Sequence, residues 1–437
     1  MATDAMPRFP DGFLWGVSTS AHQIEGAAGL REPSVWDVFT AGPGRIGDGS
    51  TAAVACDHYH RYREDVALLA GLGVDAYRFS VSWPRVNSPG GLDFYDRLVD
   101  EVCAAGVRPV PTLFHWDLPA DLDWLERDTA SRFAEYVSAV AERLGDRVGT
   151  WLTLNEPAEH TLLGHALGVH APGRKLLFDA LPVAHHQLLA HGLAVRALRA
   201  AGARDVGIAN SHGPVWPASD EPADREAADF YDVLLNRLFA DPLLLGRYPG
   251  GIGELMPGSA GRLDADLEVI AEPLDRYGVN YYAPARVGAP QDAESGTGGV
   301  RVPAGLPFSL REIEGRPLTD FGWPVVPEGL TELLTGLRER YGDRLPPVTI
   351  TENGCSYEGL DDQDRIAFLD AHVRALHRAL EAGVDVRGYF VWSLLDNFEW
   401  AQGYARRFGL VHVDFTTQAR TPKASYRWYR ELLRVQR

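Results

Sequence analysis

The amino-acid sequence predicts an α/β fold, a single (β/α)8 barrel that spans residues 1–437 with its active site at the C-terminal ends of the strands. Three observations support this prediction. Eight strand-like segments recur along the chain, helical patterns lie between them, and 437 residues are enough for one barrel of this kind. A doubly wound sheet is the alternative, but no G-x-G-x-x-G motif opens a helix here.

The strand-like segments are short, and several of them are near-continuous apolar runs. Such runs are typical of parallel strands that are buried on both faces. They cover residues 13–20, 76–83, 108–117, 149–157, 206–214, 277–284, 347–354 and 386–397.

Helical patterns and helix-ending glycines lie between the strands. Apolar residues recur at helical spacing over residues 92–102, 133–144 and 366–380, which predicts amphipathic helices with one face on a core. Glycines that would end helices stand shortly before strands, at Gly73, Gly106, Gly202 and Gly383. Residues 288–305 are rich in Gly and Pro and predict a long loop within the domain, not a linker.

Composition excludes several classes of partner. The formal charge of −18 disfavours nucleic acid, because a surface that tracks phosphates needs clustered Lys and Arg. No apolar run approaches the length of a membrane span, and the first 13 residues lack the basic and apolar regions of a signal peptide. The three cysteines cannot all pair, so we expect a soluble protein in the reducing cytoplasm. The sequence does not indicate whether the protein is a monomer or an oligomer.

Polar and aromatic side chains collect at the predicted C-terminal ends of the strands. In barrels of this kind the active site lies at these ends. The residues found there are Gln23, Arg78, His115, Trp116, Asn155, Glu156, Asn280, Tyr282, Glu352, Trp392, Glu399 and Trp400.

This inventory of carboxylates, amides and indoles suits glycoside hydrolysis, in which two carboxyl groups flank the scissile bond. Amides and carboxylates bind sugar hydroxyls, and indoles stack on the apolar face of a pyranose ring. The sequence contains no G-x-S-x-G motif and no Walker lysine loop. It predicts no metal site and no cofactor.

The chain also resembles glycoside hydrolase family 1, the β-glucosidase family, over nearly its whole length. The shared segments occur in the order and spacing of the family. They read FLWGVSTSAHQIEG, YRFSVSWPR, FHWDLP, TLNEP, VNYY, ITENG and FVWSLLDNFEW, followed by RFGLVHVDF. The resemblance implies a TIM barrel and a retaining β-glycosidase, first of all a β-glucosidase, that acts on a small or natural-product β-glycoside through a covalent glycosyl-enzyme.

The resemblance also implies a role for each residue of the predicted site. Glu156 of TLNEP would be the general acid/base and Glu352 of ITENG the nucleophile, with Arg78, Asn280 and Tyr282 around them. Asn155 would bind the sugar 2-hydroxyl. The residues implied to bind the rest of the sugar are Gln23, His115, Trp116, Trp392, Glu399 and Trp400, and Trp323 would be a platform on the aglycone side.

Two short segments depart from the family, and the motifs do not distinguish between several activities. The segments VNSPGG (86–91) and ADLDWLERD (120–128) are shorter than is usual in the family, which leaves the aglycone pocket open to question. A transglycosidase, or a β-fucosidase or β-galactosidase specificity, remains an alternative. A sugar-binding protein without activity is disfavoured, because both carboxylates are present.

Three expectations about the carboxyl pair follow. Arg78 and the Tyr282 hydroxyl should lower the pKa of Glu352, whereas burial and the charge on Glu352 should raise that of Glu156. A retaining enzyme should hold the two carboxyl groups roughly 5 Å apart. Pro157 should keep Glu156 in an extended conformation, because the residue before a proline is pushed toward β geometry.

Overall fold

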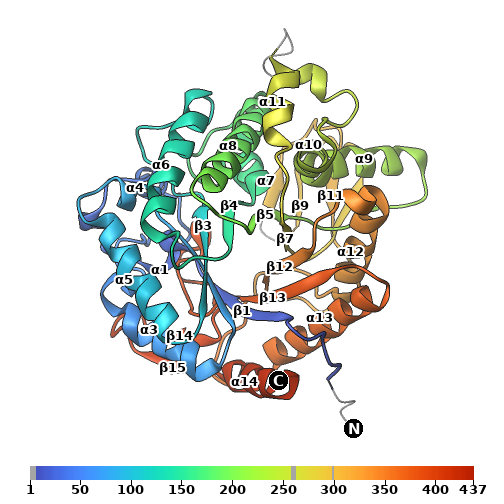
Figure 1. Cartoon of the computed structure of the whole chain (residues 1–437). Coiled ribbons are helices and arrows are strands. Elements are labelled where there is room, and N and C mark those ends of the chain that lie inside the picture. The colour runs from blue at the N-terminus through green and yellow to red at the C-terminus, as the bar shows by residue number, and fades with distance from the viewer. Residues whose placement is uncertain (1–5, 257–261, 298–299) are drawn as a thin grey trace.

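The structure is a computed structural model that describes residues 6–256, 262–297 and 300–437 (Figure 1). Residues 1–5, 257–261 and 298–299 of the predicted domain lie outside the described residues. Residues 1–5 also belong to the N-terminal segment that lacks the features of a signal peptide. Within the described ranges, no helix is long and apolar enough to cross a membrane.

Eight parallel strands close into a barrel, which confirms the predicted (β/α)8 fold (Figure 1). Seven of these strands lie within the segments predicted from the sequence, and β7 begins one residue before its segment, at Arg276. Around the barrel they are β1 (Leu14–Ser18), β2 (Ala76–Ser80), β3 (Arg108–Phe114), β4 (Trp151–Asn155), β5 (Val206–Ser211), β7 (Arg276–Asn280), β12 (Val348–Asn353) and β13 (Val386–Trp392), and β13 pairs with β1.

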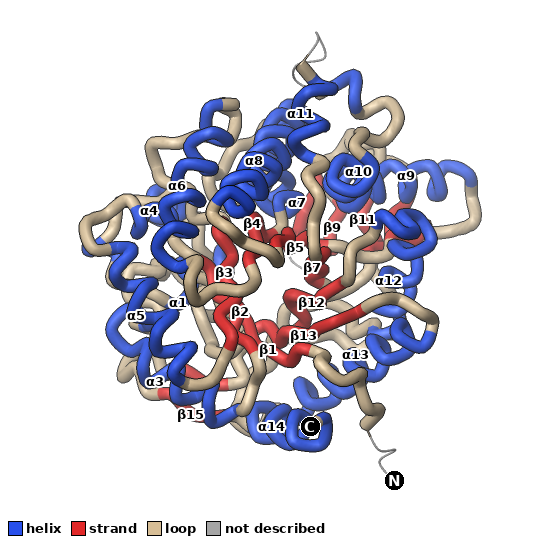
Figure 2. Tube along the Cα trace, in the orientation of Figure 1, coloured by secondary structure: helices blue, strands red, loops and turns tan. Residues whose placement is uncertain are grey.

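An outer ring of helices surrounds the strands (Figure 2). The helices that follow the strands in turn are α3 (His58–Leu72), α5 (Gly91–Ala104), α6 (Asp128–Leu144), α8 (Leu181–Ala200), α11 (Leu263–Ile270), α12 (Pro327–Tyr341), α13 (Gln363–Glu381) and α14 (Ala424–Gln436). The amphipathic helices predicted from the sequence are α5, α6 and α13. The four predicted helix-ending glycines, of which Gly73 directly follows α3, have φ angles between 74° and 93°, a conformation that costs glycine little.

Shorter elements lie in the connections. The helices are α1 (Ala21–Ile24), α2 (Val35–Thr40), α4 (Trp83–Val86), α7 (Pro157–Glu159), α9 (Pro222–Asp232) and α10 (Leu238–Leu245). Single turns of 3-10 helix cover Ala28–Leu30, Leu177–Ala180, Gly253–Leu255, Gly342–Arg344 and Trp400–Gln402, and π-helical turns cover His160–Ala166 and Val233–Arg237. The strands are β6 (Val215–Pro217), β8 (Ala285–Gly288), β9 (Ser295–Thr297), β10 (Val300–Val302), β11 (Ser309–Arg311), β14 (Val411–Val413) and β15 (Arg420–Pro422).

The segment 288–305 is more regular than the predicted loop. It contains β9 and β10, which pair in antiparallel fashion, although residues 298–299 within it lie outside the described residues.

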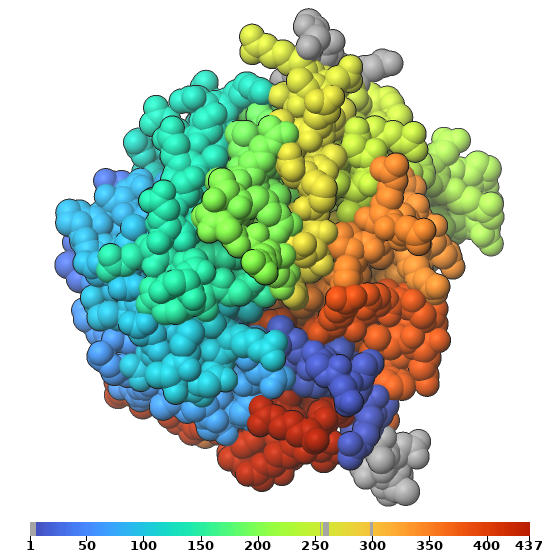
Figure 3. Space-filling model, in the orientation of Figure 1, coloured from blue at the N-terminus to red at the C-terminus, as the bar shows by residue number. Residues whose placement is uncertain are grey.

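The two ends of the described chain also meet. Gln436 of α14 accepts a hydrogen bond from the backbone N–H of Phe9 and donates one to the carbonyl of Pro7, and the blue and red segments lie side by side at one edge of the molecule (Figure 3).

The barrel interior is layered, with apolar residues below polar ones. Leu14, Ala76, Val110, Leu152, Ala209 and Phe390 form an apolar cluster of their own, separate from the large core between strands and helices. Side chains two residues apart on a strand face the same side. Arg78 therefore lies one layer above Ala76, and Trp392 one layer above Phe390, toward the C-terminal ends of the strands.

Candidate active site

The strand ends surround a cavity of about 370 Å³, which the predicted site residues line in part. Glu156, from the end of β4, and Glu352, from β12, both reach it. The other predicted residues on its wall are His115, Trp116, Tyr282, Trp323, Trp392, Glu399 and Trp400. The remaining ones, Gln23, Arg78, Asn155 and Asn280, are at most 1% exposed, and each makes a side-chain hydrogen bond with a residue that lines the cavity.

The two strands that carry the glutamates depart from regular pairing just before them. The register of β4 against β5 shifts between Leu152 and Asn155, and that of β12 against β7 shifts between Ile350 and Glu352. Such irregularities turn a strand and redirect its side chains, and they occur often beside active sites.

The backbone of Glu156 is left-handed, with φ 45° and ψ 61°, so the expectation of extended geometry was wrong. Pro157 begins α7 directly after β4, and the chain must turn sharply between them; the N–H of Glu156 still bonds the carbonyl of Ala209 at 2.7 Å. Trp116 and Trp400 also have positive φ angles. A left-handed residue other than glycine costs roughly 1–2 kcal/mol, and such residues cluster at functional sites.

Glu352 is surrounded by groups that stabilise a carboxylate. The Arg78 guanidinium lies 2.6 Å from its Oε1 in an ion pair whose two side chains are 1% and 4% exposed. The Tyr282 hydroxyl donates to Oε2 at 2.7 Å. Arg78 is itself fixed, because its Nε donates to Thr112 at 3.0 Å and its Nη2 to Asn155 at 2.6 Å.

Glu156 has fewer polar partners. The Asn280 amide donates to its Oε1 at 2.8 Å, and the same nitrogen donates to Asn155 at 3.0 Å. The oxygen of that amide accepts a hydrogen bond from Thr351 at 2.6 Å, which fixes its orientation. Asn280 thus joins the ends of β4, β7 and β12.

These surroundings separate the pKa values of the two carboxyls. Burial raises the pKa of Glu156 well above its ordinary value, and the negative charge of Glu352 raises it further, as expected. Burial also raises the pKa of Glu352, against the expectation that it would be lowered; Arg78 and Tyr282 oppose this rise without reversing it. The partners still order the two pKa values, because the rise is opposed more strongly at Glu352, by Arg78 and Tyr282, than at Glu156.

Asn155 links the charged pair to His115. Its side-chain oxygen accepts from both Arg78 and Asn280, so its nitrogen must be the donor to His115 Nε2 at 3.0 Å. His115 is then neutral with its proton on Nδ1, and burial lowers its pKa well below the ordinary value. One N–H of the Asn155 amide is left for another acceptor.

A second polar group is built around Gln23. Its amide nitrogen donates to Asn397 at 3.0 Å and to Glu399 at 3.2 Å, and its oxygen accepts from Ser20 at 2.6 Å. Burial, followed by the charge on Glu352, raises the pKa of Glu399 to about 8.

Indole rings and one imidazole form the aromatic wall. The His115 ring stacks near Trp392 and Trp400, with ring centroids 5.7 and 5.9 Å away and planes inclined by 25° and 22°. Trp116 packs 4.6 Å from Trp400, and its indole N–H donates to the Asn155 carbonyl at 3.0 Å, so its ring, not its N–H, is offered to a ligand. Trp323 stands apart from these rings, half-buried and stacked on Phe321 at 4.2 Å.

The cavity is also lined by residues that the sequence did not predict as part of the site. Glu159, Ser211 and a group of leucines line it. The leucines directly after TLNEP could have been noticed, but at helical spacing they read equally well as core residues. Among the described residues that line the cavity, none belongs to the short segments 86–91 and 120–128, so those segments do not form its wall.

Comparison with known proteins gives a consistent match. Residues 5–437 match the profile of glycosyl hydrolase family 1. The chain is 46% identical to a thermostable beta-glucosidase B from Thermobispora bispora, over 98% of this chain and 90% of that one. It is 41% identical to a bifunctional beta-D-glucosidase/beta-D-fucosidase from Bifidobacterium breve, over 97% and 98% of the two chains. The crystal structure of a psychrophilic beta-glucosidase from Micrococcus antarcticus superimposes with a TM-score of 0.90 at 44% identity, over 98% of each chain.

Proposed function

The chain belongs to glycosyl hydrolase family 1, and from that premise we propose that Glu352 is its nucleophile and Glu156 its general acid/base, within one catalytic domain of residues 1–437. The protein is a glycoside hydrolase, a retaining β-glucosidase that works by the double displacement general to the family.

In the first displacement, a Glu352 oxygen attacks the anomeric carbon as the bond from that carbon to the glycosidic oxygen breaks. Glu156 gives its proton to the departing oxygen, which leaves as the aglycone alcohol. The sugar is then esterified to Glu352, whose negative charge is gone.

The second displacement follows from that loss of charge. Without the neighbouring carboxylate, the pKa of Glu156 falls, so Glu156, now ionised, can take a proton from water. The water oxygen attacks the anomeric carbon and displaces the Glu352 carboxylate. Two inversions give overall retention of configuration.

One observation above all supports this assignment: two buried carboxyls reach the same cavity with unequal partners. Glu352 has a guanidinium and a phenol on its two oxygens, as a charged nucleophile needs. Glu156 has a single amide donor, which leaves it protonated, as an acid must be.

We propose that the glycone is glucose and that the residues around the carboxyls bind its hydroxyls. The free Asn155 N–H suits the 2-hydroxyl, the Gln23–Glu399 pair suits hydroxyls at the far side of the ring, and Trp392 gives a stacking surface. His115, Trp116 and Trp400 would complete this subsite, with Trp323 on the aglycone side.

Hydrolysis of p-nitrophenyl β-glucoside tests this function, with the β-galactoside and β-fucoside as comparisons. We expect the glucoside to have the highest kcat/KM. A higher value for the fucoside would shift the assignment toward a β-fucosidase, one of the two activities in the name of the Bifidobacterium breve relative. Absence of turnover on all three would contradict a β-glycosidase.

Two further points belong to this proposal. A transglycosidase would use the same glycosyl-enzyme with an alcohol in place of water, so products formed in the presence of added alcohols would identify that activity.

A cytoplasmic location is supported by the unpaired thiols of Cys56, Cys103 and Cys355, which suit a reducing compartment.

A further inference from the structure

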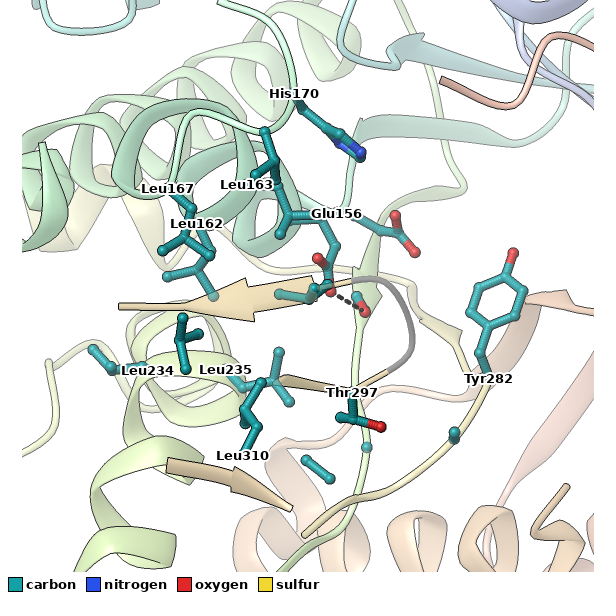
Figure 4. Close-up of a pocket in the computed structure, with 18 of the residues that line it drawn as sticks. Glu156, Leu162, Leu163, Leu167, His170, Leu234, Leu235, Tyr282, Thr297 and Leu310 are labelled. Atoms are coloured by element: carbon teal, nitrogen blue, oxygen red, sulfur yellow. Dashed lines mark hydrogen bonds between the residues drawn. The ribbon is translucent and has the colours of Figure 1, made fainter. Parts of the chain in front are cut away.

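The cavity continues beyond the catalytic carboxyls along a wall of aliphatic side chains. Leu162 and Leu163 come from the π-helical turn His160–Ala166 and Leu167 follows it, Leu234 and Leu235 come from the turn Val233–Arg237, and Leu310 comes from β11. We call these six residues the leucine wall. Figure 4 shows them gathered on the side of the pocket away from Tyr282, with Glu156 between.

Several polar side chains on this side of the pocket are already engaged by the protein. His212 uses both ring nitrogens, with Asn236 at 2.9 Å and Tyr277 at 2.8 Å. The Thr161 hydroxyl accepts from Gln187 at 2.9 Å, and Arg286 donates to backbone carbonyls. A second sugar ring placed here would bury hydroxyls against groups that are already bonded, which costs free energy for each hydroxyl left unpaired.

The mouth of the cavity is apolar as well. Val169, Leu177 and Phe178 line it and are 39%, 41% and 41% exposed. Large apolar side chains that stay exposed around a concave site commonly mark the place where an apolar ligand binds. The apolar side chains thus extend from the leucine wall to the rim.

One polar pair interrupts this surface close to the acid/base. Glu159, at the end of α7, accepts a hydrogen bond from Ser211, at the end of β5, at 3.1 Å, and both side chains line the cavity. The pair offers a hydrogen-bonding position to a single hydroxyl of a ligand, not the set of partners that a sugar ring requires.

We propose that the natural substrates are β-glucosides of bulky, mainly aliphatic alcohols, whose aglycone lies against the leucine wall and reaches the Val169–Phe178 rim, and that β-linked disaccharides are poor substrates. This inference rests on the proposed function, because the position of the aglycone is defined by Glu156. It assigns the substrate class from the chemistry of the cavity beyond the sugar.

A series of alkyl β-glucosides tests the inference on the wild-type enzyme. Butyl, hexyl and octyl alcohols are nearly equal as leaving groups, so differences in kcat/KM report binding of the alkyl chain. Each methylene that leaves water contributes about 0.8 kcal/mol, close to fourfold, when fully buried. We expect an increase on the order of 10- to 100-fold from butyl to octyl, measured below micelle-forming concentrations, and octyl β-glucoside to exceed cellobiose.

A matched pair of variants locates the effect. Leu163 is half-buried on the wall, and Leu360 is 48% exposed outside the cavity lining. Leu163→Gln should lower the octyl-to-butyl ratio of kcat/KM about 10-fold, whereas Leu360→Gln should leave that ratio unchanged. Melting temperatures of both variants report folding, and if Leu163→Gln does not fold, the wild-type series decides the inference.

The outcomes separate this inference from the proposed function. Absence of activity on p-nitrophenyl β-glucoside would contradict the proposed function itself. Activity on that substrate together with a flat alkyl series, or with cellobiose as the better substrate, would overturn the aglycone inference alone.

Discussion

Removing the Tyr282 hydroxyl is the sharpest test of how the nucleophile is kept charged. In Tyr282→Phe, Glu352 keeps the Arg78 ion pair at 2.6 Å but loses the donor 2.7 Å from its other oxygen. A hydrogen bond to a charged group contributes about 1.5–3 kcal/mol, and one pKa unit corresponds to about 1.4 kcal/mol. The pKa of Glu352 should therefore rise by about 1–2 units.

The sign of the effect on activity follows from the role proposed for each carboxyl. Glu352 must be ionised, so its pKa sets the acidic limb of the profile of kcat/KM against pH. Loss of a donor that stabilises the carboxylate raises this pKa and moves the acidic limb toward neutral pH. The alkaline limb, set by Glu156, should move less, because Tyr282 donates to Glu352 and not to Glu156.

The assay is the pH dependence of kcat/KM on p-nitrophenyl β-glucoside, with Tyr389→Phe as the control. Tyr389 is buried and, like Tyr282, donates at 2.7 Å, but to Asn353. A shift of the acidic limb in both variants would show a general effect of losing a buried hydroxyl. An unmoved acidic limb in Tyr282→Phe would refute the claim that this phenol stabilises the nucleophile.

Three further changes probe other parts of the site. Glu159→Gln should move the alkaline limb to lower pH, because the charge of Glu159 raises the pKa of Glu156; an unmoved limb would argue against this coupling. Arg85 is 1% exposed and pairs with Glu25 at 2.6 Å, so Glu25→Ala would leave a buried guanidinium without its partner. The free energy of unfolding in urea should fall by about 3–5 kcal/mol. A loss under about 1 kcal/mol would be inconsistent with a structural ion pair. Glu352→Ala should abolish turnover and regain part of it with added azide, giving a glucosyl azide of inverted configuration; a retained configuration would point to a different nucleophile.

The fold could be predicted because its signals are local. Parallel strands buried on both faces give apolar runs, and each of the eight predicted segments overlaps one barrel strand. The pairing of Glu156 with Glu352 could be predicted because both lie at the C-terminal ends of such strands, and these ends meet at one face of a barrel. The arrangement of Arg78 and Tyr282 on Glu352 agrees with the role that the family resemblance implied.

Other features depend on how distant segments pack. The rule for residues before proline is a local preference, and the turn from β4 into α7 overrides it at Glu156. Whether burial or Arg78 dominates the pKa of Glu352 depends on depth, which no motif encodes. The leucine wall is assembled from segments around residues 160–167, 233–238 and 310, far apart in the sequence, so its shape could not be read from any one of them.

The central claim is that Glu352 carries the sugar between the two displacements. A 2-deoxy-2-fluoroglucoside with a dinitrophenyl leaving group tests it directly, because the fluorine slows both steps while the activated leaving group keeps the first one fast, so the glycosyl-enzyme accumulates. Mass spectrometry of the digested protein should find the fluoroglucosyl group on Glu352. A label on any other residue, or inactivation without a covalent label, would contradict the account.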